Sequence, residues 1–501
     1  MARMTIRALM LAVTVSTAAC VNGPQASAEA ARPDTPYGEW GISFPTSATG
    51  EAQAAFVRGM TAMHLFMYPD AVKEFQAAQA ADPNFAMAFW GEALSHYRPI
   101  WREYERDEAR LVLQRLGSTP GARAAKAPTP REKAYLASLD VLYADGPPQE
   151  RMRAYSMSLQ KLTEAFPDDE EAMALWALSR VVQYPRTQDG IQERMRTAGI
   201  ADVVLRKNPR HPGAARYYIQ SVDDPVHADL GVVAADVFIT ARPNSSEARH
   251  MPTHISAQLG RWKEMADLNW EAFEISMAWT KAHGYKLQDL NNHNYGHLLT
   301  YAQYGYLQLG QFDRAREIIE LARRDYEASG KAPEIASTLA ATTAQYLVET
   351  GDPAMLKSLE DLVASDGLKS PAAHYAIGLA AARSGDLART RRALTTLGEG
   401  EGPDATIMRN ELAALVAVGE RNVPKALALL KDASAINEAQ IYTHFGPPSP
   451  YKPPHELWGE VLLEARKPTD ALKAFEAGLR IHRGRTGLVK GADRARAAIE
   501  N

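Results

Sequence analysis

The stretch ARHMPTHISAQLGRWKEM, residues 248–265, contains two histidines that are four residues apart. On a helix this spacing places His250 and His254 on one face, with their Cβ atoms about 5 to 6 Å apart. Two imidazoles at that separation can bind one metal ion or one anion. The pair is therefore the first candidate site, and its chemistry depends on which other polar groups reach it.

A zinc-type site would need a third protein ligand beside the pair. Asp223, His227 and His297 belong to the segments before and after it and are the candidates. The segment HMPTH lacks the Glu that follows the first His in the helical metalloprotease motif. A divalent transition metal held by His250, His254 and His297, or with Asp223 as the third ligand, is thus an alternative hypothesis that rests on spacing.

No established catalytic motif accompanies the histidine pair. The sequence has no G-x-S-x-G elbow, no Walker loop and no dinucleotide fingerprint, and its single cysteine lies near the N-terminus. Acid–base chemistry by the two histidines with Asp223 or Arg216 stays open. A binding protein is nevertheless favoured over an enzyme, and no cofactor is firmly indicated.

The elements that must position these residues are helices in a repeating pattern. Beyond about residue 50 the hydrophobic positions follow a helical period, and the markers of a 34-residue helical hairpin recur in register. In the first copy they are Gly59, Ala71, Phe75, Ala78 and Pro83. Gly and Ala let the two helices of a hairpin cross closely, and aromatic residues interlock neighbouring hairpins. The sequence therefore predicts an all-α fold, a right-handed α-solenoid of stacked helical hairpins.

This pattern resembles the tetratricopeptide repeat, in which certain first-helix positions line a concave groove and contact a bound partner. The resemblance implies that the following residues face the groove as ligand contacts: Arg216, Gln220, Asp223, His250, His254, His297, Glu456 and Glu460. Trp90 has a similar position in the early repeats and is expected to hold an apolar part of the ligand. The implied ligand is a protein or peptide partner, or a small anion.

A more specific resemblance lies in NPRHPGAARYYIQSVDDPVHA, ARHMPTHISAQLGRWKEMADLNWEAF and PYKPPHELWGEVLLEARKPTDALKAFEAGL. These segments resemble a family of exported bacterial tetratricopeptide proteins of unassigned function. In that family His usually stands at the positions of Arg216 and Gln220. Because a guanidinium can hold a carboxylate or phosphate by two hydrogen bonds, the substitution favours an anion over a four-histidine metal centre.

The N-terminus has the pattern of an export signal: the basic segment MARMTIR is followed by the apolar segment ALMLAVTV and then by the small residues of STAAC. Cys20 follows Thr17-Ala18-Ala19, which resembles a lipoprotein lipobox, and lipidation at Cys20 is favoured over cleavage after residue 28. We expect a signal in residues 1–20, or 1–28, and a flexible tether in 21–45. An N-terminal helical block in 46–330 and a C-terminal block in 331–501 follow.

Composition excludes several classes of function. The 501 residues carry a formal net charge of −4 without a basic block, which argues against nucleic-acid binding. Mean hydropathy is −0.32, so a polytopic membrane protein is not expected. The sequence thus predicts an exported, periplasmic binding protein that touches the membrane only through an N-terminal lipid anchor.

Overall fold

The computed structural model describes residues 37, 40–184, 189–366, 370–398, 400–443 and 446–501. Residues 37–501 form one compact unit. The predicted export signal, Cys20 and most of the predicted tether lie outside the described residues. Within the described ranges, no helix is both long and apolar enough to cross a membrane. The predicted division at residue 330 stays a prediction.

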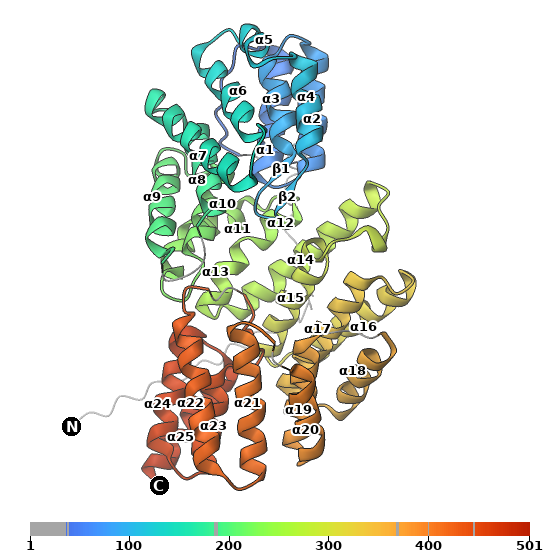
Figure 1. The fold of residues 1–501 in the computed structure, drawn as a ribbon, viewed down its shortest axis with the longest axis vertical. Coiled ribbons are helices and arrows are strands. Elements are labelled where there is room, and N and C mark those ends of the chain that lie inside the picture. The colour runs from blue at the N-terminus through green and yellow to red at the C-terminus, as the bar shows by residue number, and fades with distance from the viewer. Residues whose placement is uncertain (1–36, 38–39, 185–188, 367–369, 399, 444–445) are drawn as a thin grey trace, which may run out of the picture. The chain divides into compact units, whose positions relative to one another are not determined.

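The described chain is helical almost throughout, and consecutive helices pack against each other as hairpins (Figure 1). The first helices are α1 (Gly50–His64), α2 (Tyr68–Ala81), α3 (Ala86–Ser95), α4 (Arg106–Leu116), α5 (Pro120–Lys126), α6 (Pro130–Leu142), α7 (Pro148–Ala165), α8 (Glu170–Val181), α9 (Ile191–Lys207), α10 (Pro212–Val222), α11 (Val232–Ala241), α12 (Ser246–His250) and α13 (Pro252–Leu259). The later helices are α14 (Trp262–Ala282), α15 (Gly296–Gln308), α16 (Phe312–Ala328), α17 (Pro333–Thr350), α18 (Pro353–Asp366), α19 (Pro371–Arg383), α20 (Leu387–Leu397), α21 (Pro403–Gly419), α22 (Val423–Ala439), α23 (Pro454–Glu464), α24 (Pro468–Ile481) and α25 (Thr486–Glu500).

Two short strands interrupt the helices between α3 and α4. β1 (Tyr97–Arg98) pairs antiparallel with β2 (Glu103–Tyr104), with Tyr97 opposite Tyr104. Short 3-10 turns also occur at Ala228–Gly231, Leu287–Asp289 and Asn292–Asn294. The all-α prediction is confirmed, and the fold is an α-solenoid of stacked helical hairpins.

Close contacts between glycines and aromatic rings hold the hairpins together. A Cβ added at Gly59 in α1 would lie within 2.9 Å of three ring atoms of Phe75 in α2, and one added at Gly91 in α3 within 2.6 Å of the same atoms. Gly459 and Gly491 approach the Phe475 ring in the same way at the C-terminal end. Normal carbon contacts are about 3.5 to 4.0 Å, so glycine is what lets these helices approach. This is the packing that the repeat markers predict.

The C-terminal hairpin also contacts the middle of the chain. A Cβ at Gly260, which has a φ of +69°, would lie 2.5 Å from the carbonyl oxygen of Arg483. Trp262 Nε1 donates to the carbonyl of Gly484 at 2.8 Å, and Arg483 Nη1 pairs with Asp229 at 2.7 Å. Gly260 therefore serves both the left-handed turn after α13 and the contact with the turn between α24 and α25.

Two large hydrophobic clusters fill the interior. One is formed by buried residues between 37 and 255, and the other by buried residues between 266 and 461. Helices α12 and α13 contribute buried residues to the first cluster, whereas α15 contributes buried residues to the second. The two clusters therefore border the histidines of α12, α13 and α15.

Candidate functional site

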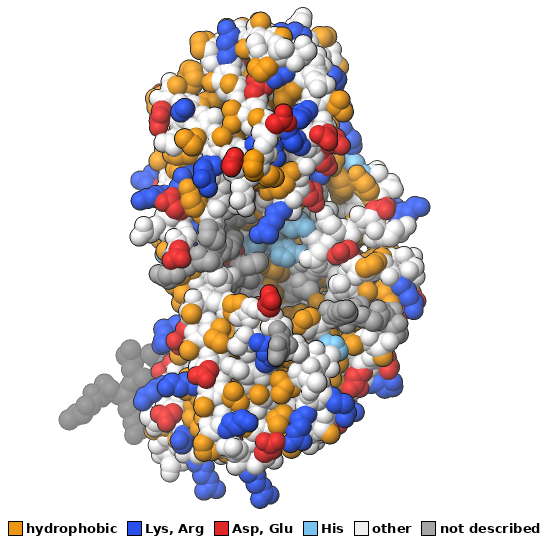
Figure 2. All heavy atoms as spheres, viewed as in Figure 1, with side chains coloured by type: hydrophobic (Ala, Val, Ile, Leu, Met, Phe, Trp, Pro, Cys, Tyr) orange, Lys and Arg blue, Asp and Glu red, His pale blue; other side chains and the backbone are white. Residues whose placement is uncertain are grey.

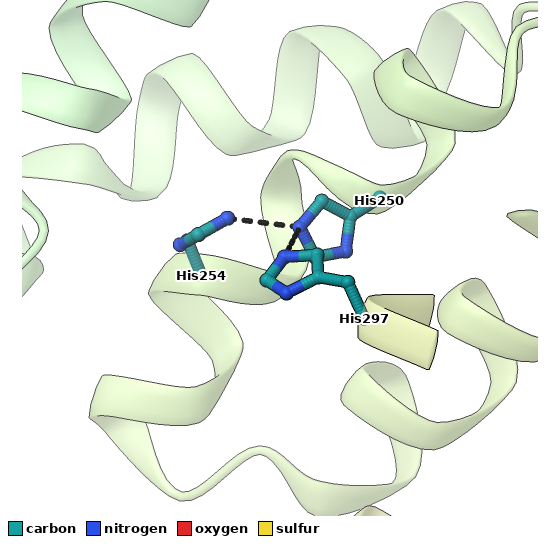
Figure 3. A group of neighbouring side chains, drawn as sticks. All are labelled: His250, His254 and His297. Atoms are coloured by element: carbon teal, nitrogen blue, oxygen red, sulfur yellow. Dashed lines mark hydrogen bonds between the residues drawn. The ribbon is translucent and has the colours of Figure 1, made fainter. Parts of the chain in front are cut away.

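Three histidines from different helices converge through one ring nitrogen each. His250 is the last residue of α12, His254 lies in α13 and His297 lies in α15. The Nε2 atom of His250 is 2.9 Å from Nε2 of His254 and 3.0 Å from Nε2 of His297 (Figure 3). The predicted partners His250, His254 and His297 are thus brought together. Figure 2 shows histidine side chains within the middle of the visible face.

Hydrogen bonds on the other side of two rings determine their tautomers. Asn269 in α14 donates its amide N–H to the Met265 carbonyl at 2.7 Å, which leaves its Oδ1 facing His250 Nδ1 at 2.6 Å. Because an amide oxygen only accepts, His250 Nδ1 is the donor. His254 Nδ1 donates in the same way to the Asp223 carboxylate at 2.8 Å. In the neutral rings, both Nε2 atoms therefore present lone pairs to each other.

Burial disfavours the charged form of two of the three rings, those of His250 and His297. His250 is 0% exposed, and burial, followed by the neighbouring His254, lowers the pKa of His250 to about 3. Burial also holds the pKa of His297 well below its usual range, and the nearby His250 and His293 lower it further. Neutral imidazole is the form that binds metal ions.

A cavity of about 530 Å³ adjoins the cluster, and His297 forms part of its wall. Its other lining residues include Gln258, Tyr301, Tyr304, Gln345, Asp404, Gln440, Pro447, Pro448, Ser449 and Tyr451. Tyr301 lines the same cavity and also contacts the cluster, because its ring centroid is 4.5 Å from that of His297 and 5.0 Å from that of His250. A cavity of this volume is in the range of ligand sites.

Gln345 in α17 is an unusual member of this wall. It is 1% exposed, and neither its amide nitrogen nor its amide oxygen has a hydrogen-bond partner within the described part of the chain. An unpaired buried amide costs free energy, whereas a ligand that offers both a donor and an acceptor would satisfy it. Gln345 therefore indicates that the cavity suits a ligand group with both a hydrogen-bond donor and an acceptor.

The expected groove contacts of α10 are buried instead. Arg216 is 1% exposed, its guanidinium lies 3.3 Å from the centroid of the Phe66 ring, and it pairs with Glu247. Burial alone would raise the pKa of Glu247, but Arg216 and then His293 outweigh it and hold that pKa well below its usual range. Arg216 is thus buried rather than at an open groove, and a carboxylate of the chain pairs with its Nη2, so its contact with an anionic ligand stays a prediction.

Gln220 and Asp223 are also less exposed than positions in an open groove would be. Gln220 is 9% exposed and Asp223 is 0% exposed. Asp223 binds His254 through Oδ2, and its Oδ1 accepts from Gln258 Nε2 at 3.0 Å. Asp223 thus supports a histidine from behind, and its direct contact with a ligand stays a prediction.

Trp90 and the two C-terminal glutamates also lie elsewhere than expected. Trp90 is 0% exposed and packs edge-on against Tyr135 at 5.0 Å, within the core. Glu456 is 4% exposed and binds Lys452 at 2.9 Å and Arg485 at 2.5 Å. Glu460 binds the same lysine at 2.8 Å. Repeat position alone overestimated the exposure of Trp90 and Glu456, which neighbouring elements cover, whereas the Glu460 side chain is 32% exposed.

A second histidine cluster contains Glu171 between His64 and His211, all fully buried. His64 Nε2 lies 2.8 Å and His211 Nε2 3.2 Å from the carboxylate. His211 Nδ1 accepts from the backbone N–H of Ala214, and His64 Nδ1 contacts the Tyr217 hydroxyl at 2.9 Å. Three of the four ring nitrogens therefore have a hydrogen-bond partner, and His211 Nε2 faces the carboxylate without a hydrogen bond among the described residues.

Sequence reasoning missed several members of both sites. Asn269 and Gln345 lie in later helices with no motif around them, and no sequence pattern announces that they reach the histidines or the cavity. Glu171 was missed because its partners are far away along the chain. The third-ligand candidate His227 lies against Asp224, at 2.9 Å, and outside the three-histidine group.

The stacked hairpins, with their glycine and aromatic contacts, define a helical-repeat fold. No family model matches the sequence, and no curated protein matches it. Among solved structures, yeast Tom70 is similar with 12% identity and a TM-score of 0.36, over 90% of this chain and 96% of that one. The APC/C hetero-tetramer Cut9-Hcn1 is similar at 12% identity and a TM-score of 0.31, over 89% and 76%. The P58(IPK) TPR domain is similar at 11% identity and a TM-score of 0.23, over 90% and 99%.

Proposed function

We propose that this chain is a tetratricopeptide-type binding protein that holds a peptide segment of a protein partner in the cavity beside His297. The observation that carries the proposal is the unpaired, buried amide of Gln345 in the cavity wall. A peptide bond offers one N–H donor and one C=O acceptor, which together match both ends of a glutamine amide. The cavity thus suits a peptide backbone.

The charge of the cavity wall supports a peptide over a small anion. None of the described residues that line the cavity is Lys or Arg, and Asp404 is among them. Arg216, on which the anion hypothesis depended, is paired with Glu247. Tyr301, Tyr304, Trp262 and the prolines of the wall offer apolar area for peptide side chains.

The test uses peptides selected on the full chain from a random display library and then titrated calorimetrically with EDTA present. Gln345→Leu keeps the size of the side chain but removes two hydrogen bonds, and we expect binding to weaken about tenfold or more. Gln303→Leu is the control, since Gln303 is also buried but bonds the Ala315 carbonyl outside the cavity wall. Selected peptides that bind Gln345→Leu as tightly as the wild type would refute the proposal.

We also propose that the protein is exported to the periplasm and anchored there by a lipid on Cys20. The support is the basic, apolar and small-residue pattern of residues 1–20. Cys20→Ser should move the protein from the membrane fraction to the soluble fraction. An unchanged distribution would contradict the anchor.

A further inference from the structure

We infer that His250, His254 and His297 bind one divalent transition metal ion, zinc or a metal of similar preference, through their three Nε2 atoms. The inference goes beyond the proposed peptide binding and does not depend on it. It rests on the convergence of the three nitrogens, on the groups behind the rings and on the contrast with the second histidine cluster.

The arrangement of lone pairs calls for a cation. Asn269 and Asp223 can only accept from the Nδ1 atoms of His250 and His254, so when both rings are neutral their unprotonated Nε2 atoms face each other at 2.9 Å. Two such lone pairs repel each other. A positive ion between them converts the repulsion into two favourable bonds.

The spacing of the nitrogens is close to that of a metal site. Zinc–nitrogen bonds of about 2.0 to 2.1 Å in tetrahedral geometry place two ligand nitrogens about 3.3 Å apart. His250 Nε2 lies 2.9 Å from the nitrogen of His254 and 3.0 Å from that of His297. Each of these two pairs would need to separate by only about 0.3 to 0.4 Å, and the three ligand nitrogens all lie within 4.8 Å of one another.

The groups behind the rings are those that support metal ligands. In zinc proteins a ligating histidine usually donates its other N–H to a carboxylate or carbonyl oxygen, which orients the ring. Asp223 does this for His254 and Asn269 for His250. Asp223 is itself fixed by Gln258, and Asn269 by the Met265 carbonyl. Both rings are therefore oriented before any ion arrives.

The cluster of His64, Glu171 and His211 shows a different arrangement, in which a carboxylate lies between two rings. His64 Nε2 hydrogen-bonds to Glu171, His211 Nε2 lies 3.2 Å from the same carboxylate, and the outer ring nitrogens have the Tyr217 hydroxyl and a backbone N–H as partners. No pair of lone pairs is forced together. Both clusters bring three possible ligand atoms close together. They differ in that a carboxylate separates the rings in one cluster, whereas ring nitrogens face each other directly in the other.

The donor set indicates which ion fits. Three neutral imidazoles suit zinc, copper, nickel or cobalt, whereas magnesium and calcium prefer oxygen ligands. Three histidines are also the ligand set of zinc sites that leave one coordination position for water or another ligand. Because His297 lines the cavity, such a position lies beside the proposed peptide site.

The experiment strips the full chain with EDTA, removes the chelator and titrates it with Zn²⁺ by calorimetry, with bound zinc counted by mass spectrometry. We expect about one zinc per chain. Asp223→Asn should weaken binding about 10- to 100-fold, and His254→Gln or His297→Gln should weaken it more. His283→Gln is the matched control, because His283 also lies beside a carboxylate, Asp70, at 3.3 Å, but outside the cluster.

A second measurement needs no variant and so survives a variant that fails to fold. Co²⁺ added to the wild-type chain should give the intense visible bands of a nitrogen-ligated tetrahedral ion, and Zn²⁺ should abolish them. Wild type without stoichiometric zinc, or zinc binding that persists in both His254→Gln and His297→Gln, would overturn the inference. The peptide titrations contain EDTA and therefore exclude bound metal, so neither result here affects the test of the peptide proposal.

Discussion

Replacing Gly91 with alanine tests the packing that defines the repeat. Gly91 lies within α3, and its added Cβ would come within 2.6 Å of three atoms of the Phe75 ring. The ring would have to move by about 1 Å to restore a normal carbon contact. Gly59 approaches the same ring atoms, and Phe56 packs on the ring at 5.6 Å, so there is little room for that movement.

The expected loss follows from two opposing effects. Overpacking a well-filled core costs about 1 to 3 kcal/mol, and the required shift favours the upper half of that range. Alanine regains about 1 kcal/mol because it is the better helix former. Gly91→Ala should therefore destabilise the fold by about 1 to 2 kcal/mol. Gly199→Ala in α9 is the control: nothing lies within 4 Å of its added Cβ, so it should stabilise the fold by up to about 1 kcal/mol.

Urea unfolding followed by far-ultraviolet circular dichroism measures both shifts as changes of midpoint, which stay meaningful where a repeat array unfolds in several steps. Phe75→Leu should cost less stability in the Gly91→Ala background than in the wild type, because the smaller side chain relieves the clash. A Gly91→Ala chain at least as stable as the wild type, with Gly199→Ala behaving as expected, would refute this account of the packing.

Two further predictions concern buried charges. Arg485→Met should cost about 3 to 5 kcal/mol of folding free energy, because Glu349 and Glu456 lose the buried guanidinium that pairs with them. Arg496→Met is the control: Arg496 belongs to a half-exposed ion pair, so its loss should change the folding free energy by less than about 0.5 kcal/mol. Thermal unfolding of both variants measures the difference. Burial raises the pKa of Glu411 to about 8, so the folded state binds this proton more tightly and stability falls as the pH rises from about 4.5 through 8. Glu411→Gln should flatten that decline in melting temperature between pH 5 and pH 8.5, and an unchanged slope would contradict it.

The fold could be predicted from the sequence because its markers act locally. Gly59 and Phe75 belong to one hairpin, so their spacing follows directly from helix geometry. The contact of Gly260 with Arg483 could not be foreseen in this way, since 483 − 260 = 223 residues separate them. Likewise, the pairing of β1 with β2 depends on a short loop whose residues form no strand pattern.

The site could be predicted only in part, for the same reason. The spacing of His250 and His254 follows from a helical turn, and a repeat-based position suggested His297. The sequence does not show that α14 brings Asn269 behind His250, or that α10 brings Asp223 behind His254, because these contacts depend on how whole helices pack. Repeat position gave the direction of each side chain but not what covers it, which is why Arg216 and Trp90 were expected at an open groove.

The same arrangement explains how Arg216 and a metal site can coexist in one chain. The guanidinium does not point at the three Nε2 atoms; it pairs with Glu247, which also contacts His293. His293 stacks on His297 with ring centroids 5.4 Å apart, so Glu247 and His293 connect Arg216 to the cluster. The positive charge is thereby neutralised before it can repel a cation. An arginine at this position therefore does not argue against a metal held by His250, His254 and His297.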